Sequence, residues 1–217
     1  MLDLEGLLNG QTNTLEILFL LSLITLLPSI VVMMTSFTRI IIVLSFLRNA
    51  LGMQQSPPNQ VLVGIALFLT LFIMQPVFGA VYSEAYLPYE AGEIDGETAL
   101  TNLQTPLKEF MLRQTKPGDL NTFLGFAELE MPADPLDLSL VVVIPAFMTS
   151  ELRQAFIMGF LIYLPFIVID MAVASTLMSM GMIMLPPVMI SMPFKLLLFV
   201  LVDGWALTVD TLVRGFH

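Results

Sequence analysis

The sequence contains no cysteine and only one histidine, and these absences exclude several kinds of chemistry. Without cysteine, the chain has no disulfide, no thiolate ligand for a metal and no thiol nucleophile. The one histidine, His217, is the last residue of the sequence, where a frayed terminus is the ordinary interpretation. A zinc site built from His and Cys is therefore excluded, and we expect neither a metal nor another cofactor.

Charge is also scarce, and what there is has one predominant sign. Charged residues make up 12% of the chain and hydrophobic residues 57%, with a mean hydropathy of +0.88. A soluble domain is about 25% charged and about 45–50% apolar. The eight Lys and Arg residues stand against 18 Asp and Glu residues, a net charge of −10, so the basic surface that nucleic acid requires is missing. The composition indicates a membrane protein that does not bind nucleic acid.

Sequence motifs of the common enzyme classes are absent as well. The chain has no G-x-x-x-x-G-K-[ST] phosphate-binding loop, no H-E-x-x-H zinc motif and no G-x-S-x-G nucleophile turn. Asp170 and Asp203 are the pair that an intramembrane aspartyl protease would use, since that chemistry needs two carboxyl groups sharing a proton. Asp203 stands in "LVDGW", without the Gly-x-Gly-Asp context of such proteases. We therefore expect a protein that is not an enzyme.

Long apolar runs are what the sequence does contain. Residues 15–34 carry one charge, at their edge, and residues 61–81 carry none. At about 1.5 Å per helical residue, each run is long enough to cross a hydrocarbon layer of roughly 30 Å. Proline inside these runs predicts kinks. Together with the apolar character that returns at Leu138, the pattern predicts an all-α, membrane-associated fold with long kinked apolar hairpins.

A small acidic block interrupts the apolar sequence. Between residues 82 and 138 there are eleven acidic and three basic residues, so this block holds −8 of the net charge. The segment "TPLKEFMLRQT" predicts a helix with Thr105 as N-cap and Pro106 at its first position, and a second helix is predicted from Asp119. We therefore divide the chain into N-terminal apolar helices (1–81), an acidic helical region (82–137) and C-terminal apolar helices (138–217).

Basic residues predict the topology of the chain. Arg39 and Arg48 lie near the ends of both clear apolar runs and have no acidic neighbour, so their loop is expected on the cytoplasmic side. The acidic region and the N-terminus are then outside, which in a bacterium is the periplasm. The opening "MLDLEGLLNG" has no basic segment typical of a signal peptide, so an outside N-terminus suggests that such a peptide has been removed.

Several ionisable residues lie within apolar sequence in the last third of the chain. A charge at the centre of a lipid-facing helix costs about 2.5–3.5 kcal/mol, so such residues usually pair or are buried against protein. Asp170 and Lys195 are either residues that extend to the membrane interface or an ion pair joining two helices or two subunits, and we favour the ion pair. Arg39, and Glu151 and Arg153 of "TSELRQ", are candidates for contacts between subunits, although Arg39 also fits a simple cytoplasmic flank.

Methionine alternates with other residues in "TLMSMGMIMLPPVMISMPF", with Met at 178, 180, 182 and 184. Neither an amphipathic helix nor a strand explains this pattern, because a helix repeats every three or four residues and strands favour β-branched or aromatic residues. Gly181 before the run and Pro186-Pro187 after it favour a non-helical loop. Methionine that simply fills a core is the alternative to a functional role.

Four long strings of the sequence, taken together, resemble one family. They are "TSFTRIIIVLSFLRNALG", "QQSPPNQVL", "VIPAFMTSELRQAFIMGFLIYLPFIVIDMAVASTLMSMGMIMLPP" and "PFKLLLFVLVDGW". The chain resembles the FliP family, the export-gate subunits of flagellar type III secretion, which are related to SctR of injectisomes. The resemblance covers residues 15–81 and 138–216. Two positions depart from the family pattern, Ile157, where a polar residue is usual, and Ile183, which interrupts a Met triplet.

The resemblance implies a function that composition does not show. It implies a five-copy helical assembly with FliQ and FliR in the bacterial inner membrane and the flagellar basal body, next to FlhB and FlhA. This assembly opens for unfolded flagellar proteins, and the loop at Met182, Ile183 and Met184 is implied to form the constriction. Much of the apolar surface would then pack on partners as well as on membrane lipid.

Two other functions compete with the export gate. A secondary transporter with Asp170 as its proton site predicts inverted repeats, and no repeat is visible in the sequence. A passive membrane scaffold predicts that the methionine run tolerates bulky replacements without effect on conductance.

Overall fold

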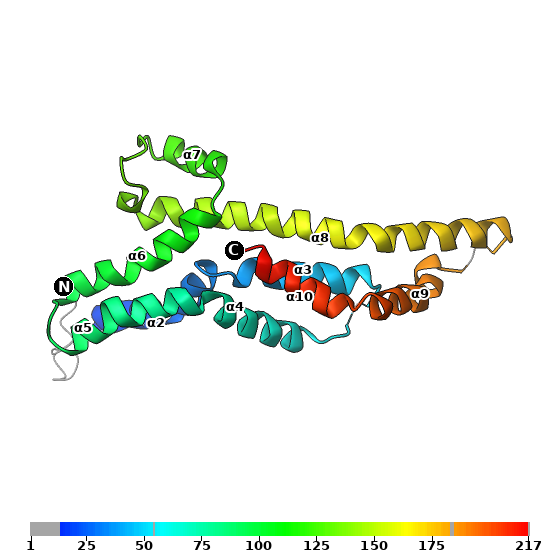
Figure 1. Cartoon of the computed structure of the whole chain (residues 1–217), viewed down its shortest axis with the longest axis horizontal. Coiled ribbons are helices and arrows are strands. Elements are labelled where there is room, and N and C mark those ends of the chain that lie inside the picture. The colour runs from blue at the N-terminus through cyan, green and yellow to red at the C-terminus, as the bar shows by residue number, and fades with distance from the viewer. Residues whose placement is uncertain (1–13, 54, 183–184, 217) are drawn as a thin grey trace.

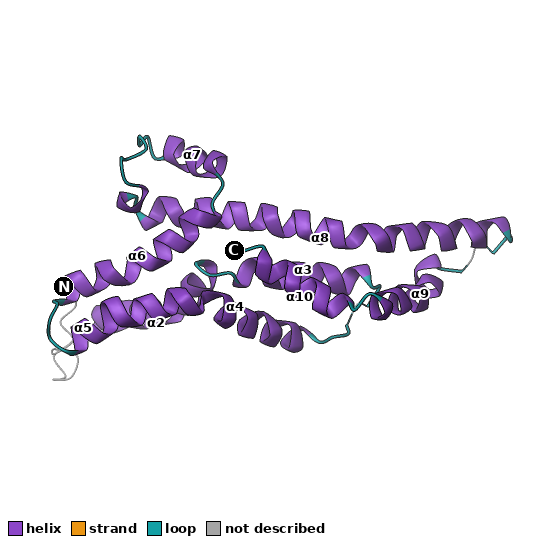
Figure 2. Cartoon of the chain, in the orientation of Figure 1, coloured by secondary structure: helices purple, strands orange, loops and turns teal. Residues whose placement is uncertain are grey.

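Helices make up the regular structure of this protein. The computed structural model describes residues 14–53, 55–182 and 185–216, and among these residues every regular element is a helix (Figure 2). The prediction of an all-α fold is confirmed. The molecule is elongated, with the acidic region at one end of its long axis and the connection between α8 and α9 at the other (Figure 1).

The predicted apolar runs form helices with nearly the expected bounds. The N-terminal helices are α2 (Thr14–Met33), α3 (Phe37–Ala50) and α4 (Asn59–Val81). Pro58, in an extended conformation, sets the start of α4 after the predicted loop. The helix continues past its apolar part through a π-helical turn (Tyr82–Tyr86) and α5 (Leu87–Glu90). The continuous helix Asn59–Glu90 is long and apolar enough to cross a membrane.

The acidic region folds into helices whose starts differ from the prediction. Its elements are α6 (Gly96–Gln114), α7 (Pro117–Phe126) and a 3-10 turn (Pro135–Asp137). The N-cap of α6 is Asp95, which accepts a hydrogen bond from the Thr98 amide at 3.0 Å. The predicted N-cap, Thr105, is wrong because its hydroxyl instead donates to the Thr101 carbonyl, one turn back, and Pro106 lies inside the helix. Pro117, not Asp119, begins α7, as the preference of proline for the first helical turn explains.

Capping also makes the start of α6 sensitive to pH. Hydrogen bonds from Thr98 hold the pKa of the Asp95 carboxyl below its ordinary value. Because the folded-state pKa is the lower one, the ionised cap stabilises α6 above the unfolded-state pKa. That stabilisation is lost as the pH falls through the folded-state pKa.

One very long helix organises the C-terminal part. Helix α8 (Leu140–Ser179) has 40 residues and starts at the N-cap Ser139, whose hydroxyl accepts from the Val141 amide. At about 1.5 Å per residue it is about 60 Å long, twice a hydrocarbon layer of roughly 30 Å. Helices α9 (Pro187–Leu201) and α10 (Gly204–Arg214) return beside it, with a bend of 65° between them (Figure 1).

The core lies where the acidic region meets the apolar helices. Phe110 and Met111 of α6 and Leu120 of α7 are buried with residues of α3, α4, α8 and α10, so the acidic region shares one core with the rest. A second, smaller buried cluster includes Leu47, Phe166 and Phe199. Many other apolar side chains are exposed, as for Phe68 (77%) on α4 and Val168 (65%) on α8. Such exposed apolar surface leaves a large area for lipid or other subunits.

Candidate pore loop and buried ion pairs

The α8–α9 connection begins with a well-defined helix end. The Gly181 amide donates to the Met178 carbonyl and the Met182 amide to the Leu177 carbonyl, both at 3.0 Å. This is the Schellman arrangement, and it requires a left-handed residue, which Gly181 supplies with a φ of +76°. Pro187 then occupies the first turn of α9. Glycine and the proline pair therefore border the connection as the sequence predicted.

The methionines at this connection point away from the core of the chain. Met178 is 62% exposed, Met180 67%, Met189 68% and Met182 37%. The alternation found in the sequence spans the end of α8 and the start of the connection. Of the three predicted constriction residues, Ile183 and Met184 lie outside the described residues. In the single chain, these four exposed methionines are not core-filling side chains.

An ion pair joins the two helices that carry the connection. Lys195 Nζ of α9 lies 2.6 Å from Asp170 Oδ2 of α8, and the Ser191 hydroxyl donates to the other oxygen of Asp170. The Lys195 side chain is 1% exposed and that of Asp170 is 27% exposed. The two residues that the sequence analysis paired thus meet within one chain, where they fix α9 against α8.

A second ion pair lies in the core and involves several segments. Arg39 of α3 forms a two-pronged contact with the carboxylate of Glu151 on α8, and both side chains are almost fully buried. The same guanidinium donates to the Gly215 carbonyl at 2.7 Å and to the Gln114 amide oxygen at 3.1 Å, and lies 3.8 Å from the centre of the Phe216 ring. Its hydrogen-bonding capacity is therefore used by three segments distant in sequence.

A third network attaches α7 to the same turn of α8. The buried Asp119 carboxylate accepts hydrogen bonds from the Ser150 hydroxyl at 2.7 Å and from Arg153 Nη2 at 2.6 Å. The Ser150 oxygen also accepts from the Lys116 amide. The segment "TSELRQ" thus serves two networks, one through Glu151 and the other through Ser150 and Arg153.

These networks change the interpretation of three residues that we expected at contacts between subunits. In the structure, Arg39 and Glu151, which are 112 residues apart in sequence, pair with each other within one chain. Arg39 is 2% exposed and contacts the end of α6, so it is not a freely exposed cytoplasmic flank residue. Arg153 has a partner too, but its side chain is 52% exposed and still faces outward.

Sequence reasoning missed Asp119, Gln114 and Phe216. No periodicity or motif connects these residues to the ionisable residues of α3 and α8. The sequence analysis used Asp119 only as the start of a helix. In the structure this acid is 5% exposed within a helix otherwise rich in apolar residues, and a buried carboxylate needs a partner.

Neither a metal site nor a carboxylate pair emerges from the geometry of the described part of the chain. No group of three or more His, Cys, Asp or Glu residues there could hold a metal ion. Asp170 bonds to Lys195 and Ser191, whereas Asp203 lies at the bend between α9 and α10.

Fold and buried pairs together define an all-α protein of the membrane type. Within the described residues, two helices are able to cross a membrane, and a third span is possible if α9 and α10 act as one broken span. A model of the FliP family matches residues 20–212, and the chain belongs to that family. It is 53% identical to the flagellar biosynthetic protein FliP of Pectobacterium carotovorum over 96% of this chain and 81% of the relative. The FliP of Bacillus subtilis is 51% identical over 94% of this chain and 93% of the relative.

A third relative is somewhat less similar in sequence. The flagellar biosynthetic protein FliP of Aquifex aeolicus is 47% identical, over 94% of this chain and 87% of its own length. The resemblance read from the sequence is confirmed. The chain is a component of the flagellar type III export apparatus, and the predicted function is confirmed at that level.

Proposed function

We propose that several copies of the chain form, with FliQ and FliR, a gated pore for unfolded flagellar proteins, and that Met182, Ile183 and Met184 close it. The observation that carries this proposal is the α8–α9 hairpin. It ends in a methionine-rich connection at one end of the molecule, and the Asp170–Lys195 pair fixes its two helices together (Figure 1). The hairpin thus presents flexible apolar side chains on a rigid support.

Methionine suits a gate that passes many different polypeptides. Its unbranched thioether side chain adapts to irregular shapes, and surfaces rich in methionine can repack around varied partners. A narrow ring of apolar side chains also closes a channel to ions, because water leaves an apolar constriction. Such a gate needs no catalytic group, which agrees with our expectation that the chain is not an enzyme.

The exposed apolar faces support an assembly in the bacterial inner membrane at the flagellar basal body. The length of helix α8 is about twice the thickness of a hydrocarbon layer. Part of its exposed apolar face must therefore meet protein or extend beyond the lipid. Five copies, with FliQ and FliR, and with FlhB and FlhA as neighbours, are what the family resemblance implies. The exposed guanidinium of Arg153 remains a candidate contact between subunits.

Native mass spectrometry of the detergent-extracted complex tests the assembly. We expect several copies of this chain together with FliQ and FliR in one particle. A stable particle containing one copy of the chain would contradict the proposed pore.

The acidic region is proposed to be periplasmic, with Arg48 as the remaining topological signal because Arg39 is buried in the core. A cysteine at Glu93, an exposed position, should react with a membrane-impermeant thiol reagent when only the outer membrane is permeable. The chain has no cysteine of its own, so the label reports this one site. Reaction only after disruption of the inner membrane would place the acidic region in the cytoplasm.

The Asp170–Lys195 pair is proposed to hold the hairpin in the geometry that assembly requires. Either Asp170→Ala or Lys195→Ala leaves a charge without its partner, and we expect each to reduce motility and the yield of complex. In a double-mutant cycle the two changes should couple by about 0.5–3 kcal/mol, the range for contacting residues. The charge swap Asp170→Lys with Lys195→Asp should restore part of the function, whereas additive effects of the single changes would show that the pair does not act as a unit.

A further inference from the structure

Helix α10 is connected to α9 by a sharp bend. Asp203 lies at this bend with a φ of +49°, a left-handed conformation that is uncommon for a residue with a side chain. The next residue, Gly204, has no room for a Cβ atom, since that atom would lie 2.1 Å from the ring of Phe199. Two adjacent residues thus produce the 65° bend between α9 and α10, and backbone rotation there would reorient all of α10.

The other end of α10 is held by polar and aromatic contacts. The Gly215 carbonyl accepts from Arg39, and the Phe216 carbonyl accepts from the Gln114 amide at 3.1 Å. The Phe216 ring lies between the Arg39 guanidinium and the ring of Phe110, with ring centroids 6.2 Å apart. We refer to these contacts of Gly215 and Phe216 with Arg39, Gln114 and Phe110 as the latch.

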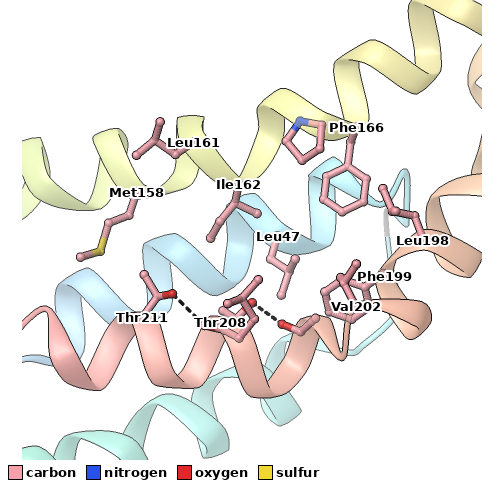
Figure 3. A pocket seen from close by; sticks show the side chains of 13 residues that line it. Leu47, Met158, Leu161, Ile162, Phe166, Leu198, Phe199, Val202, Thr208 and Thr211 are labelled. Carbon is pink, nitrogen blue, oxygen red and sulfur yellow. Dashed lines mark hydrogen bonds between the residues drawn. The ribbon is translucent and has the colours of Figure 1, made fainter.

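Between the bend and the latch, α10 lies over an apolar cavity. The cavity has a volume of about 470 Å³ and is lined by residues of α3, α8, α9 and α10 (Figure 3). Leu47, Ile162 and Phe166 are among its lining side chains. The Thr208 and Thr211 hydroxyls each donate to a carbonyl of α10 itself, one turn back. The middle of α10 therefore lacks close packing on one side, and dispersion contacts are lost there.

The interactions that stabilise α10 as a helix are internal to it. They include both threonine hydrogen bonds and the ion pair between Arg214 and Asp210, one turn apart at 2.7 Å. These contacts stay intact if α10 moves as a rigid body. The contacts that would break include the latch, the burial of Leu212, the packing of Val213 against the core and the edge-to-face contact of Trp205 with Phe199 of α9.

We infer that α10 is a strap, hinged at Asp203 and Gly204 and held in place by the latch, which swings outward as one unit and widens the partly open cavity beneath it. Arg39 links this strap to the rest of the molecule, because the guanidinium that holds Gly215 and Phe216 also binds Glu151 of α8 and Gln114 of α6. A displacement of α6 or α8 that repositions Arg39 therefore weakens the latch. The acidic region and the strap are coupled through Arg39 and through the direct contacts of Gln114 and Phe110 with Phe216.

Cysteine labelling in membranes containing the full chain tests the strap. Single cysteines at Thr208 and at Leu212 report the middle and the end of α10, both of which are buried in the closed form. The latch is weakened by Phe216→Ala, or more mildly by Gln114→Ala, and both changes leave the Arg39–Glu151 pair in place. We expect the rate of labelling at both cysteines to rise together, on the order of tenfold for Phe216→Ala, since a desolvated cation–π contact has a strength of this order.

Two controls separate a swinging strap from other changes. Arg214→Ala alters an exposed pair on the same helix and should leave labelling at both sites unchanged. A cysteine at Ala66, fully buried on α4, should stay unreactive in every variant, since it reports unfolding of the core.

Three results would overturn the inference. Faster labelling at residue 212 alone would mean that the end of α10 frays without a hinge. Unchanged labelling at both sites in both latch variants would mean that the latch does not hold α10. A parallel rise at residue 66 in both latch variants would mean that α10 does not open without the core.

Discussion

Replacing Arg39 with alanine is expected to destabilise the folded chain strongly and to reduce its accumulation. The change leaves the Glu151 carboxylate, which is 0% exposed, without its charged partner, and it also removes the donors to Gly215 and Gln114. Breaking a buried ion pair from one side costs roughly 3–5 kcal/mol. Typical unfolding free energies are about 5–15 kcal/mol, so this loss is a large part of the total. Glu151→Ala should have a similar effect by leaving the guanidinium unpaired.

Thermal unfolding of the detergent-extracted chain, followed by circular dichroism, measures this effect, and the yield from membranes reports it in cells. The matched control is Asp210→Ala, which breaks an ion pair of the same type at the surface, where the two side chains are 80% and 53% exposed. Exposed pairs contribute about 0–1 kcal/mol, so the control should unfold almost as the unmodified chain does. Equal stability of the Arg39 and Asp210 variants would show that the buried pair does not hold the core together.

Replacing both Arg39 and Glu151 is not expected to restore all of the stability that either single alanine variant loses. Apolar residues of similar size often substitute for a buried ion pair without cost, because the desolvation penalty disappears as well. Here Arg39 also satisfies the Gly215 carbonyl and the Gln114 side chain. We therefore expect Arg39→Met with Glu151→Leu to be more stable than either single alanine variant, yet less stable than the unmodified chain.

Features that depend on a local sequence pattern could be predicted from the amino-acid sequence. The runs 15–34 and 61–81 predicted α2 and α4 within two residues of their observed bounds, since uninterrupted apolar sequence of that length has few alternatives to a helix. Gly181 and the following proline pair predicted the break between α8 and α9. In contrast, the start of α6 was predicted ten residues too late, because proline inside a helix cannot be distinguished locally from proline at its beginning.

Tertiary pairing was only partly predictable from the sequence. Asp170 and Lys195 are 25 residues apart and flank one connection, so a hairpin brings them together. Arg39 and Glu151 are 112 residues apart, and no local rule relates them. Their contact depends on how α3 packs against α8, which the near-uniform apolar sequence of both helices leaves undetermined. The length of the continuous α8, 40 residues with Pro145 and Pro165 in its interior, was not predicted from the sequence.

Replacing Met182, Ile183 and Met184 together with alanine is expected to make the closed export gate leak small ions. Alanine removes every side-chain atom beyond Cβ at each of the three positions, in every copy around the constriction. The contacts across the seal are lost, and a wider apolar neck admits water and ions. Met182 is already 37% exposed in the single chain, so its truncation should leave the fold and the yield of complex unchanged.

Single-channel conductance of the purified complex, or inhibition of growth by salt in cells that express the variant, measures the leak. The matched control truncates three other exposed methionines: Met178 on α8, Met180 at the C-cap of α8 and Met189 on α9. It removes three apolar side chains of similar size without touching the three proposed constriction residues. If the control leaks and the first variant stays tight in a correctly assembled complex, the constriction lies on the flanking helices. If neither leaks, the seal belongs to the partner subunits, and methionine at this connection serves the passage of substrate rather than closure.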